Sequence, residues 1–394
     1  MGRLGSGHTR MVRIVKILYV AVDTLIPGTH GGSVHVQELC CALARRGHEV
    51  HLVAPSAKVS APGDVSQDLK LHRFRQPPRF LEWTAVRQVR RIAAAESPDV
   101  LVERFYTFGG AGIWAAHSLE IPAVLEVNSP ARSIDYFWRD KLDRLTLVRP
   151  VDRWRRQVLR WSDAVYTTSR HLVPPELQRA VTVVGCGVDV ARFRPGPSSG
   201  PTGPLRCVYV SSFRPWHGAE DLVNAVALCR KRGVELRVTC IGRGPRWESA
   251  RRAAKKAGLD ETISFLGEIP FEDVPRHLAD ADVGLAPFAP ASFKVLEEIG
   301  WFWSPIKIFE YLAAGLTVVT IDIAEMRALL PDTVGSFYTP GGVEELAVTL
   351  EQLALNKDVV RANRDTARAL AESRYTWDHQ AALLETILQK VVAT

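Results

Sequence analysis

The stretch PGPSSGPTGP at residues 195–204 divides this chain into two parts. Proline, glycine and serine fill nearly all of it, a composition that favours an open linker over a helix or a strand. On each side of it, short apolar runs typical of buried strands alternate with helical patterns. We therefore predict two domains, at residues 14–195 and 205–371, joined by a linker at residues 196–204.

The part before the linker begins with an apolar run at residues 14–22, followed by the glycine-rich stretch PGTHGGS and a helical pattern. The runs EVHLVAP, PDVLVERF, PAVLEVNS and DAVYTTS follow as further strands. Strands that alternate with helices predict a parallel sheet that carries helices on both faces. Residues 1–13 are mostly polar and rich in glycine, so we expect a disordered lead there.

The same order of patterns restarts after the linker. LRCVYVSS predicts a strand, AEDLVNAVALCRKRG a helix, and VELRVTCIG, TISFLG, DVGLAPF and LTVVTID predict further strands. The fold class is therefore α/β, with two doubly wound domains. Ligands of such sheets bind beyond the carboxyl ends of the strands, so two facing domains would line one cleft. Residues 372–394 predict an amphipathic helix that returns to the first domain.

Composition narrows the classes of protein and ligand. The chain has 394 residues, 46% of them apolar, with a net charge of +7. This charge suits a phosphate-bearing ligand or an anionic membrane surface, although a composition rich in arginine would also produce it. Six cysteines without a CxxC pair favour a reducing compartment over a disulfide framework. No apolar run is long enough for a membrane span.

The stretch SPIKIFEYLAAG at residues 304–315 predicts a helix whose first turn carries functional side chains. Ser304 can cap the helix and Pro305 suits its first turn. Lys307 and Glu310 share one face, with the lysine placed for a phosphate and the glutamate for the hydroxyl groups of a ribose. The alternative is an ion pair on a solvated face, which the apolar neighbours disfavour.

Three other loops join a strand to a helix and carry glycines, cations or a hydroxyl group, which suits anion binding at a helix start. The alternatives are plain turns and surface arginines. The candidate residues in these loops are Gly31, Gly32, Ser33, Arg214, His217, Gly242, Arg243 and Gly244.

Polar residues end two predicted strands of the first domain. Arg104 and Tyr106 follow one strand, while Glu126 and Asn128 follow the next. We expect them to meet at one edge of the sheet, near the predicted cleft. The alternative is a structural ion pair between Arg104 and Glu126. The basic segment at residues 137–161 predicts an ordinary surface helix, or else a contact with a membrane or an anionic acceptor.

Several stretches together resemble the retaining glycosyltransferases of family 4, which have the GT-B fold. They are GGSVHVQELCCALARRGHEVHLVAP, SDAVYTTSRHL, VGCGVDVARFRP and SPIKIFEYLAAGLTVVT, in this order along the chain. The resemblance implies transfer of a sugar from a nucleotide-diphosphate donor, with UDP or GDP as the nucleotide, to a glycan, lipid-linked or small-molecule acceptor. It implies that Glu310 holds the ribose and that Gly31 and Gly32 approach the diphosphate.

The chain departs from the family pattern at three places. Phe302 stands eight residues before Glu310, where the family usually has a glutamate. Ser212 and His217 stand where it has an arginine and a lysine, and Asn128 where it often has a histidine. We interpret these departures as a subgroup in which Arg214, His217 and Lys307 supply the charge for the phosphates. The catalytic candidates are then Lys307, Glu310 and Asn128.

The remaining expectations concern cofactors, partners and alternatives. No DxD stretch lies at the end of a predicted strand, and the sequence has no cluster of histidine and cysteine, so we expect metal-independent transfer without a cofactor. We expect no nucleic-acid partner and a cytoplasmic protein that can touch the inner membrane face. The alternatives are an epimerase that acts on the nucleotide sugar and a non-catalytic protein that binds it.

Overall fold

A computed structural model describes residues 13–28, 31–55, 68–106, 108–130, 148–196 and 203–393. Most of the predicted lead and linker, and the basic segment up to residue 147, lie outside these ranges. The chain forms two compact units. The first comprises Met1–Thr167, Leu172–Val184 and Ala381–Thr394, and the second Thr168–His171 and Gly185–Gln380. The domain limits drawn from the sequence stay a prediction.

Seven strands of the described chain form the sheet of the first unit, in the order β3-β2-β1-β4-β5-β6-β7. Every neighbouring pair is parallel. The strands are β1 Lys16–Val20, β2 Glu49–Pro55, β3 Leu69–Phe74, β4 Val100–Phe105, β5 Ala123–Val127, β6 Ala164–Thr167 and β7 Thr182–Val183.

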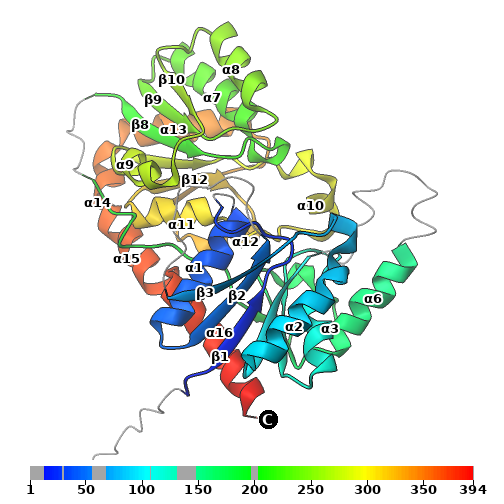
Figure 1. The fold of residues 1–394 in the computed structure, drawn as a ribbon. Helices are drawn as coiled ribbons and strands as arrows, with labels where there is room; N and C mark the ends of the chain where they lie inside the picture. The colour runs from blue at the N-terminus through cyan, green and yellow to red at the C-terminus, as the bar shows by residue number, and fades with distance from the viewer. Residues whose placement is uncertain are drawn as a thin grey trace, which may run out of the picture. The chain divides into compact units, whose positions relative to one another are not determined.

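Helices cover both faces of this sheet (Figure 1), with α1 and most of α16 on one face and α2, α3 and α6 on the other. Buried Val36, Leu39 and Leu43 share one side of α1, and the chain reverses after it at Gly47, whose φ of 96° is left-handed. The helices are α1 Gly31–Arg45, α2 Val86–Glu96, α3 Ala111–Ser118, α6 Val148–Arg160 and α16 Trp377–Val392, with 3-10 turns at Arg79–Ala85 and Arg170–Leu172.

The second unit repeats this architecture with six parallel strands in the order β10-β9-β8-β11-β12-β13. In both sheets the first strand of the unit lies beside its second and its fourth, which is the doubly wound order. The strands are β8 Leu205–Val210, β9 Leu236–Ile241, β10 Ile263–Gly267, β11 Val283–Ala286, β12 Thr317–Ile321 and β13 Gly335–Tyr338.

The helices of the second unit include short ones beside the ends of the strands. They are α7 Ala219–Lys231, α8 Trp247–Lys256, α9 Val274–Ala279, α10 Lys294–Ile299, α11 Ile306–Ala313, α12 Ala324–Leu329, α13 Val343–Leu355, α14 Lys357–Ala362 and α15 Arg364–Arg374, with 3-10 turns at Pro215–His217, Phe271–Asp273 and Pro290–Ser292. No helix among the described residues is long and apolar enough to cross a membrane.

The predicted α/β class and the doubly wound order are confirmed, and the strands marked as apolar runs are present. Patterning missed β3, β7 and β13, because β3 has a single buried residue and β7 and β13 have only two and four residues. The single helix predicted for residues 372–394 was wrong in its start. The backbone leaves the helix at Tyr375 and Thr376, where Val188 forms a β-bridge with Thr376 and donates its N–H to Tyr375 O.

Candidate functional site

Two loops meet in backbone contact at the carboxyl edge of the second sheet. One follows β8 and contains Ser211 and Ser212, and the other follows β9 and contains Gly242 and Gly244. A Cβ atom on Gly242 would lie 1.9 Å from the carbonyl oxygen of Ser211, and one on Gly244 would lie 1.8 Å from that of Ser212. These glycines are therefore required by the packing of the two loops, whatever they bind.

Lys307 lies in the first turn of α11, and its ammonium is buried. Its Nζ lies 5.5 Å from the ring centre of Tyr209 and 5.3 Å from that of Phe288. No described residue accepts a hydrogen bond from this Nζ. Burial lowers the pKa of Lys307 to about 7, against the opposing effect of Glu310. A buried ammonium held only by aromatic rings is expected to attract an anionic ligand.

Glu310 lies one turn further along α11 and is 6% exposed. Burial raises the pKa of its carboxyl group to about 7, while Lys307 and Arg192 lower it. Lys307 and Glu310 therefore lie on one face as predicted, but in a buried place and not as a pair on a solvated face.

His217 follows β8 and is held by Ser211. The backbone N–H of Phe213 donates to Ser211 Oγ (3.0 Å), and this hydroxyl lies 2.8 Å from His217 Nδ1. When the hydroxyl donates to Nδ1, the imidazole keeps its proton on Nε2. Burial, Lys307 and Arg214 lower the pKa of His217 to about 2, so the ring is neutral. The neutral ring offers a hydrogen-bond donor. A bound anion would favour the protonated, positively charged ring.

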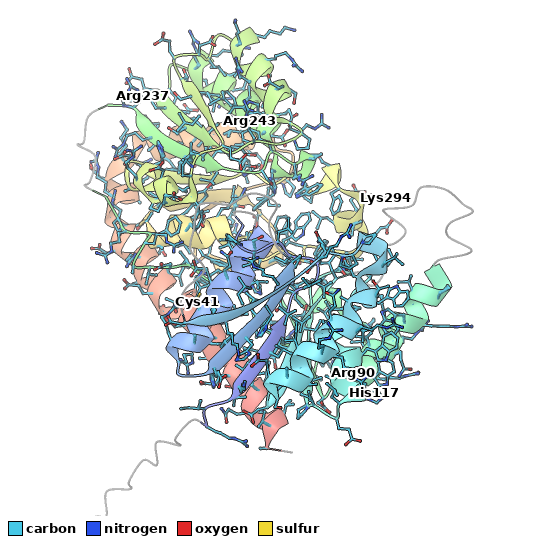
Figure 2. The ribbon with its side chains drawn as sticks, viewed as in Figure 1. Cys41, Arg90, His117, Arg237, Arg243 and Lys294 are labelled. Carbon is cyan, nitrogen blue, oxygen red and sulfur yellow. The ribbon has the colours of Figure 1, made fainter. Side chains whose placement is uncertain are left out.

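The predicted arginines of the second unit are exposed, and Ser304 contacts a distant backbone group. Arg214 and Arg243 are exposed, and Arg243 lies over the Trp247 ring at 5.7 Å, in the loop after β9 (Figure 2). Ser304 does not cap α11. Its Oγ accepts the backbone N–H of Cys186 at 2.9 Å, and Pro305 is the N-cap residue directly before α11.

An aromatic cluster of Trp216, Phe293, Phe302 and Trp303 precedes α11, and the sequence interpretation did not foresee it. The ring centres of Trp216 and Phe293 lie 4.4 Å apart, those of Trp216 and Trp303 5.3 Å, and those of Phe302 and Trp303 4.8 Å. Phe302 is 6% exposed. The position where the family usually has a glutamate is therefore part of an apolar contact in this chain.

In the first unit, Glu126 of β5 is the centre of a dense polar network. Its carboxylate accepts hydrogen bonds from the hydroxyl groups of Tyr19 and Tyr166 and from Asn128 Nδ2 (2.6 Å). It also pairs with His35 Nε2 at 2.9 Å and with Arg104 Nη1 at 3.2 Å. The residue has no exposed surface.

This network explains the ionisation of Glu126. Burial alone would raise its pKa, but His35, Arg104 and the hydrogen bonds outweigh burial and hold the pKa well below its usual range. The structural ion pair that the sequence left as an alternative for Arg104 is therefore present. Because every partner is buried or half-buried, Glu126 fixes the positions of its neighbours.

Arg104 connects this network to the glycine loop. A Cβ atom on Gly32 would lie 3.3 Å from Arg104 Nη2, so the missing side chain leaves room for the guanidinium. Arg104 Nε lies 3.8 Å from Asp23. α1 begins at Gly31, and Ser33 does not cap it, because its hydroxyl donates to the carbonyl of Leu25 at 2.9 Å.

Glu103 and Tyr106, which lie near Arg104 at the end of β4, have surroundings that differ from those of Glu126. Glu103 precedes Arg104 on β4, and its carboxylate accepts the backbone N–H groups of Gly110 and Ile113, both at 2.7 Å, at the start of α3. Successive residues of a strand face opposite sides of the sheet, so Glu103 is separated from the Glu126 network. Tyr106 is half-buried and interacts electrostatically with Arg104.

The sequence did not predict the residues that surround Glu126 in the first unit or Lys307 and His217 in the second. In the first unit these are Tyr19, His35 and Tyr166, and in the second Tyr209, Ser211 and Phe288. A polar side chain within an apolar run was the available signal for the tyrosines of β1 and β6. Their meeting on one carboxylate depends on the strand order, which brings β1 and β6 to opposite sides of the β4–β5 pair.

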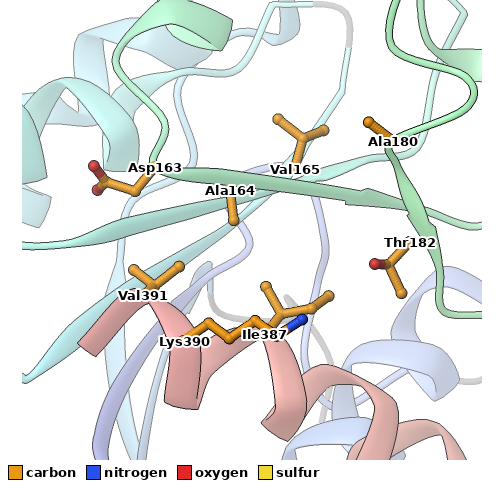
Figure 3. Close-up of a pocket in the computed structure, with 8 residues that line it drawn as sticks. All are labelled: Asp163, Ala164, Val165, Ala180, Thr182, Ile387, Lys390 and Val391. Carbon is orange, nitrogen blue, oxygen red and sulfur yellow. The ribbon is translucent and has the colours of Figure 1, made fainter. Parts of the chain in front are cut away.

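A cavity of about 350 Å³ in the first unit lies apart from the predicted residues (Figure 3). It is formed by β6, β7 and the end of α16, with Asp163 and Lys390 among apolar side chains. None of the residues predicted from the sequence lines it. It therefore gives no support to the predicted site.

Comparison with known families identifies both units. Residues 30–174 match the profile described as "Glycosyl transferase 4-like domain", and residues 204–356 match "Glycosyl transferases group 1". Together the two profiles match more than half of the chain. The chain belongs to glycosyltransferase family 4. The resemblance inferred from the sequence is thereby confirmed.

The curated proteins related to the glycosyltransferase have low sequence identity to it. The colanic acid biosynthesis glycosyltransferase WcaL of Escherichia coli is 26% identical over 64% of this chain and 60% of its own length. A GDP-mannose-dependent alpha-(1-6)-phosphatidylinositol monomannoside mannosyltransferase of Mycobacterium tuberculosis is 28% identical over 52% of this chain and 54% of its own length. The chain thus spans less than two thirds of the length of these relatives.

Solved structures share the fold of the glycosyltransferase. Sucrose-phosphate synthase of Thermosynechococcus elongatus superposes with a TM-score of 0.72 at 16% identity, covering 96% of this chain and 99% of the other. Anabaena HepE in complex with UDP gives 0.68 at 18% identity, covering 95% and 100%. The GT-B fold is therefore confirmed.

Proposed function

We propose that this glycosyltransferase moves a sugar from a nucleotide-diphosphate sugar to a hydroxyl group of an acceptor. The observation that carries the proposal is the buried ammonium of Lys307, which has no hydrogen-bond partner among the described residues and lies at the start of α11. A helix N-terminus and a buried cation both favour a phosphate. Glu310, one turn away, would accept hydrogen bonds from the hydroxyl groups of the ribose.

The nucleotide of the donor is UDP or GDP in this proposal. The HepE structures contain UDP and UDP-glucose, and the mycobacterial relative is named as dependent on GDP-mannose. These ligands belong to those proteins, and they make the two nucleotides the first to test. The acceptor in our proposal is a glycan, a lipid-linked sugar or a small molecule.

We infer a retaining, metal-independent reaction. The bond from the anomeric carbon to the diphosphate oxygen breaks, and a bond from that carbon to the acceptor oxygen forms on the same face. The acceptor proton passes to the leaving phosphate oxygen. Lys307 and Arg214 would stabilise the negative charge that grows on the diphosphate, and His217 would donate its Nε2–H there. These groups would stabilise the charge on the diphosphate, which a divalent cation stabilises in metal-dependent enzymes.

The first unit would serve the acceptor. Asn128 is half-buried, and its amide is oriented by Glu126, which also holds Arg104 and His35. We assign Asn128 to the acceptor hydroxyl and Glu126 to the positioning of its neighbours. A fully buried carboxylate with five partners has little capacity left for a substrate.

We also infer a cytoplasmic protein that can touch an anionic membrane surface. Arg153, Arg156 and Arg160 are exposed on α6, at spacings that bring them to one side of the helix. Binding to vesicles that contain anionic lipid, compared with neutral vesicles, tests this part of the proposal. Equal binding to both kinds of vesicle would overturn it.

A ligand screen followed by product analysis tests the main proposal. The full chain is heated with a panel of UDP and GDP sugars, with each free sugar and nucleoside monophosphate as controls. The donor should raise the melting temperature by mass action. The selected donor is then incubated with acceptors in the presence of a chelator, and NMR of the product gives the configuration of the anomeric carbon.

Each outcome has a defined meaning. An acceptor glycoside with the anomeric configuration of the donor, formed in the chelator, supports the proposal. Conversion of the donor to an isomer without acceptor would indicate an epimerase, and donor binding without turnover over a broad acceptor panel would indicate a non-catalytic binding protein. Loss of turnover in the chelator, with the fold intact, would overturn the metal-independent step.

A further inference from the structure

Two histidines and a glutamate converge at the β3 side of the first sheet, whereas Glu126 lies on β5. His51 lies in β2, His72 in β3, and Glu96 is the last residue of α2. Their ligand atoms all lie within 4.8 Å of one another, and we name these three residues the histidine cluster. The sequence predicted no metal site, because the three residues are 21 and 24 positions apart and form no known spacing motif.

The distances within the histidine cluster match those between the ligands of a zinc ion. His51 Nδ1 lies 3.2 Å from His72 Nε2 and 3.4 Å from Glu96 Oε2, and His72 Nε2 lies 3.9 Å from Glu96 Oε1. In a tetrahedral zinc site, bonds of about 2.0–2.1 Å place neighbouring ligand atoms about 3.3 Å apart. One ion could therefore contact both ring nitrogens and one carboxylate oxygen of Glu96 after small side-chain movements.

The orientation of His51 also suits a metal ligand. Its Nε2 donates to Glu49 Oε1 at 2.8 Å, because a carboxylate can only accept. This leaves Nδ1 unprotonated in the neutral ring, and Nδ1 is the atom that faces His72 and Glu96. Metal-binding histidines commonly donate their second ring N–H to a carboxylate, which fixes the tautomer.

We propose that the histidine cluster binds Zn²⁺, with His51, His72 and Glu96 as ligands and a water molecule in the fourth position. The His51 side chain is 2% exposed, and those of His72 and Glu96 are each 17% exposed, so the ion can enter from the His72 side. The ion replaces the hydrogen bond between the two facing ring nitrogens, and the proton of His72 moves from Nε2 to Nδ1 when the ion binds. This inference is independent of the proposed transfer reaction.

Two lysines oppose the ion and limit its affinity. Lys70 Nζ lies 2.8 Å from Glu96 Oε2, and Lys16 Nζ lies 3.2 Å from Glu49 and 3.8 Å from Glu96. The Lys70 side chain is 58% exposed, so it can release Glu96 and turn into solvent. Removing Lys70 should therefore tighten zinc binding, because the ammonium competes with the metal for the same carboxylate.

The site would stabilise the first unit and leave catalysis unaffected. It joins the end of α2 to β2 and β3, while Glu126 lies near the carboxyl end of β5. An ion that binds the folded chain and not the unfolded chain raises the melting temperature. We expect zinc to raise it and His72→Gln to abolish the increase.

The test uses the full chain without a histidine tag, stripped with a chelator and titrated with Zn²⁺ in a calorimeter. We expect one ion per chain, loss of this binding in His72→Gln, and tighter binding in Lys70→Met. His379→Gln is the matched control, because His379 is exposed on α16 and outside the cluster. Circular dichroism of each variant checks that it folds.

Cobalt(II) in place of zinc identifies the ligands, since six cysteines are present. Bands of nitrogen and oxygen coordination without thiolate charge-transfer bands support the histidine cluster. Thiolate bands, equal binding by His72→Gln and wild type, or no binding by the folded wild-type chain would each overturn the proposal. Weaker binding by Lys70→Met than by wild type would overturn the predicted competition.

Discussion

The two units each bury a charged centre, and the two centres differ in how completely their polar groups are paired. Glu126 in the first unit has five partners on one carboxylate. Lys307 in the second unit faces two aromatic rings and has no hydrogen-bond partner in the described chain. The partners therefore account for the difference between the two centres, because the pKa shift of Glu126 favours its charged form and that of Lys307 favours its neutral form.

This difference separates positioning from binding. Glu126 stays ionised because cations and donors surround it, and its pKa lies well below the usual range. Lys307 and Glu310 are both shifted toward their neutral forms, with pKa values of about 7, because burial dominates. A paired centre holds its neighbours in place, whereas an unpaired one gains most from an external ligand.

The largest expected effect is on folding, from Glu126→Gln. The substitution leaves Arg104 and His35 buried without their carboxylate, which should lower the free energy of unfolding by about 3–5 kcal/mol. Urea unfolding followed by circular dichroism measures this. Glu248→Gln, at an exposed position of α8, is the control and should change stability by less than about 0.5 kcal/mol. Equal stability of both variants would show that Glu126 is not the centre of the network.

Lys307→Met should have the largest effect on catalysis. We expect kcat/KM for the donor to fall about 100-fold, because roughly 2.7 kcal/mol of charge stabilisation at the diphosphate is lost. Stability should stay the same or increase, since an apolar side chain replaces a buried cation. Lys294→Met, at a side chain that is 76% exposed, is the matched control and should retain full activity. Full activity of Lys307→Met would refute the phosphate role.

Glu310→Gln should weaken donor binding by about 10-fold, or about 1.4 kcal/mol, because a charged acceptor for the ribose hydroxyl groups is lost. Calorimetric titration of wild type and variant with the ribose and 2′-deoxyribose forms of the donor nucleotide tests this contact. If Glu310 holds the ribose, the deoxy form should bind the variant almost as well as the ribose form does. Independent, additive losses would place the ribose elsewhere.

The smallest expected effect is a change of donor affinity with pH, of a few fold. Lys307 is charged below its pKa of about 7 and Glu310 above its own pKa of about 7, so affinity should be highest near pH 7. Lys307→Met should remove the decrease on the basic side, and Glu310→Gln the decrease on the acidic side. Titrations between pH 5.5 and 8.5 would contradict this if both variants kept the wild-type profile.

Local patterns in the sequence predicted much of the fold and part of the candidate site. Buried parallel strands read as continuous apolar runs, so β2, β4, β5 and β12 were visible without any tertiary information. Helical spacing placed Lys307 and Glu310 on one face of α11. The capping role predicted for Ser304 was wrong, because its hydroxyl oxygen accepts a hydrogen bond from the distant backbone N–H of Cys186.

The sequence by itself determined the strand and helix order, the family, and the identity of the charged residues at the ends of the strands. Only the tertiary structure decided which of those charges have partners. Strand order brings Tyr19 and Tyr166 to Glu126 from positions 107 and 40 residues away, whereas no residue that the structure describes forms a hydrogen bond with Lys307 Nζ. Pairing over such separations depends on the packing of whole strands, and it sets the pKa and role of each charge.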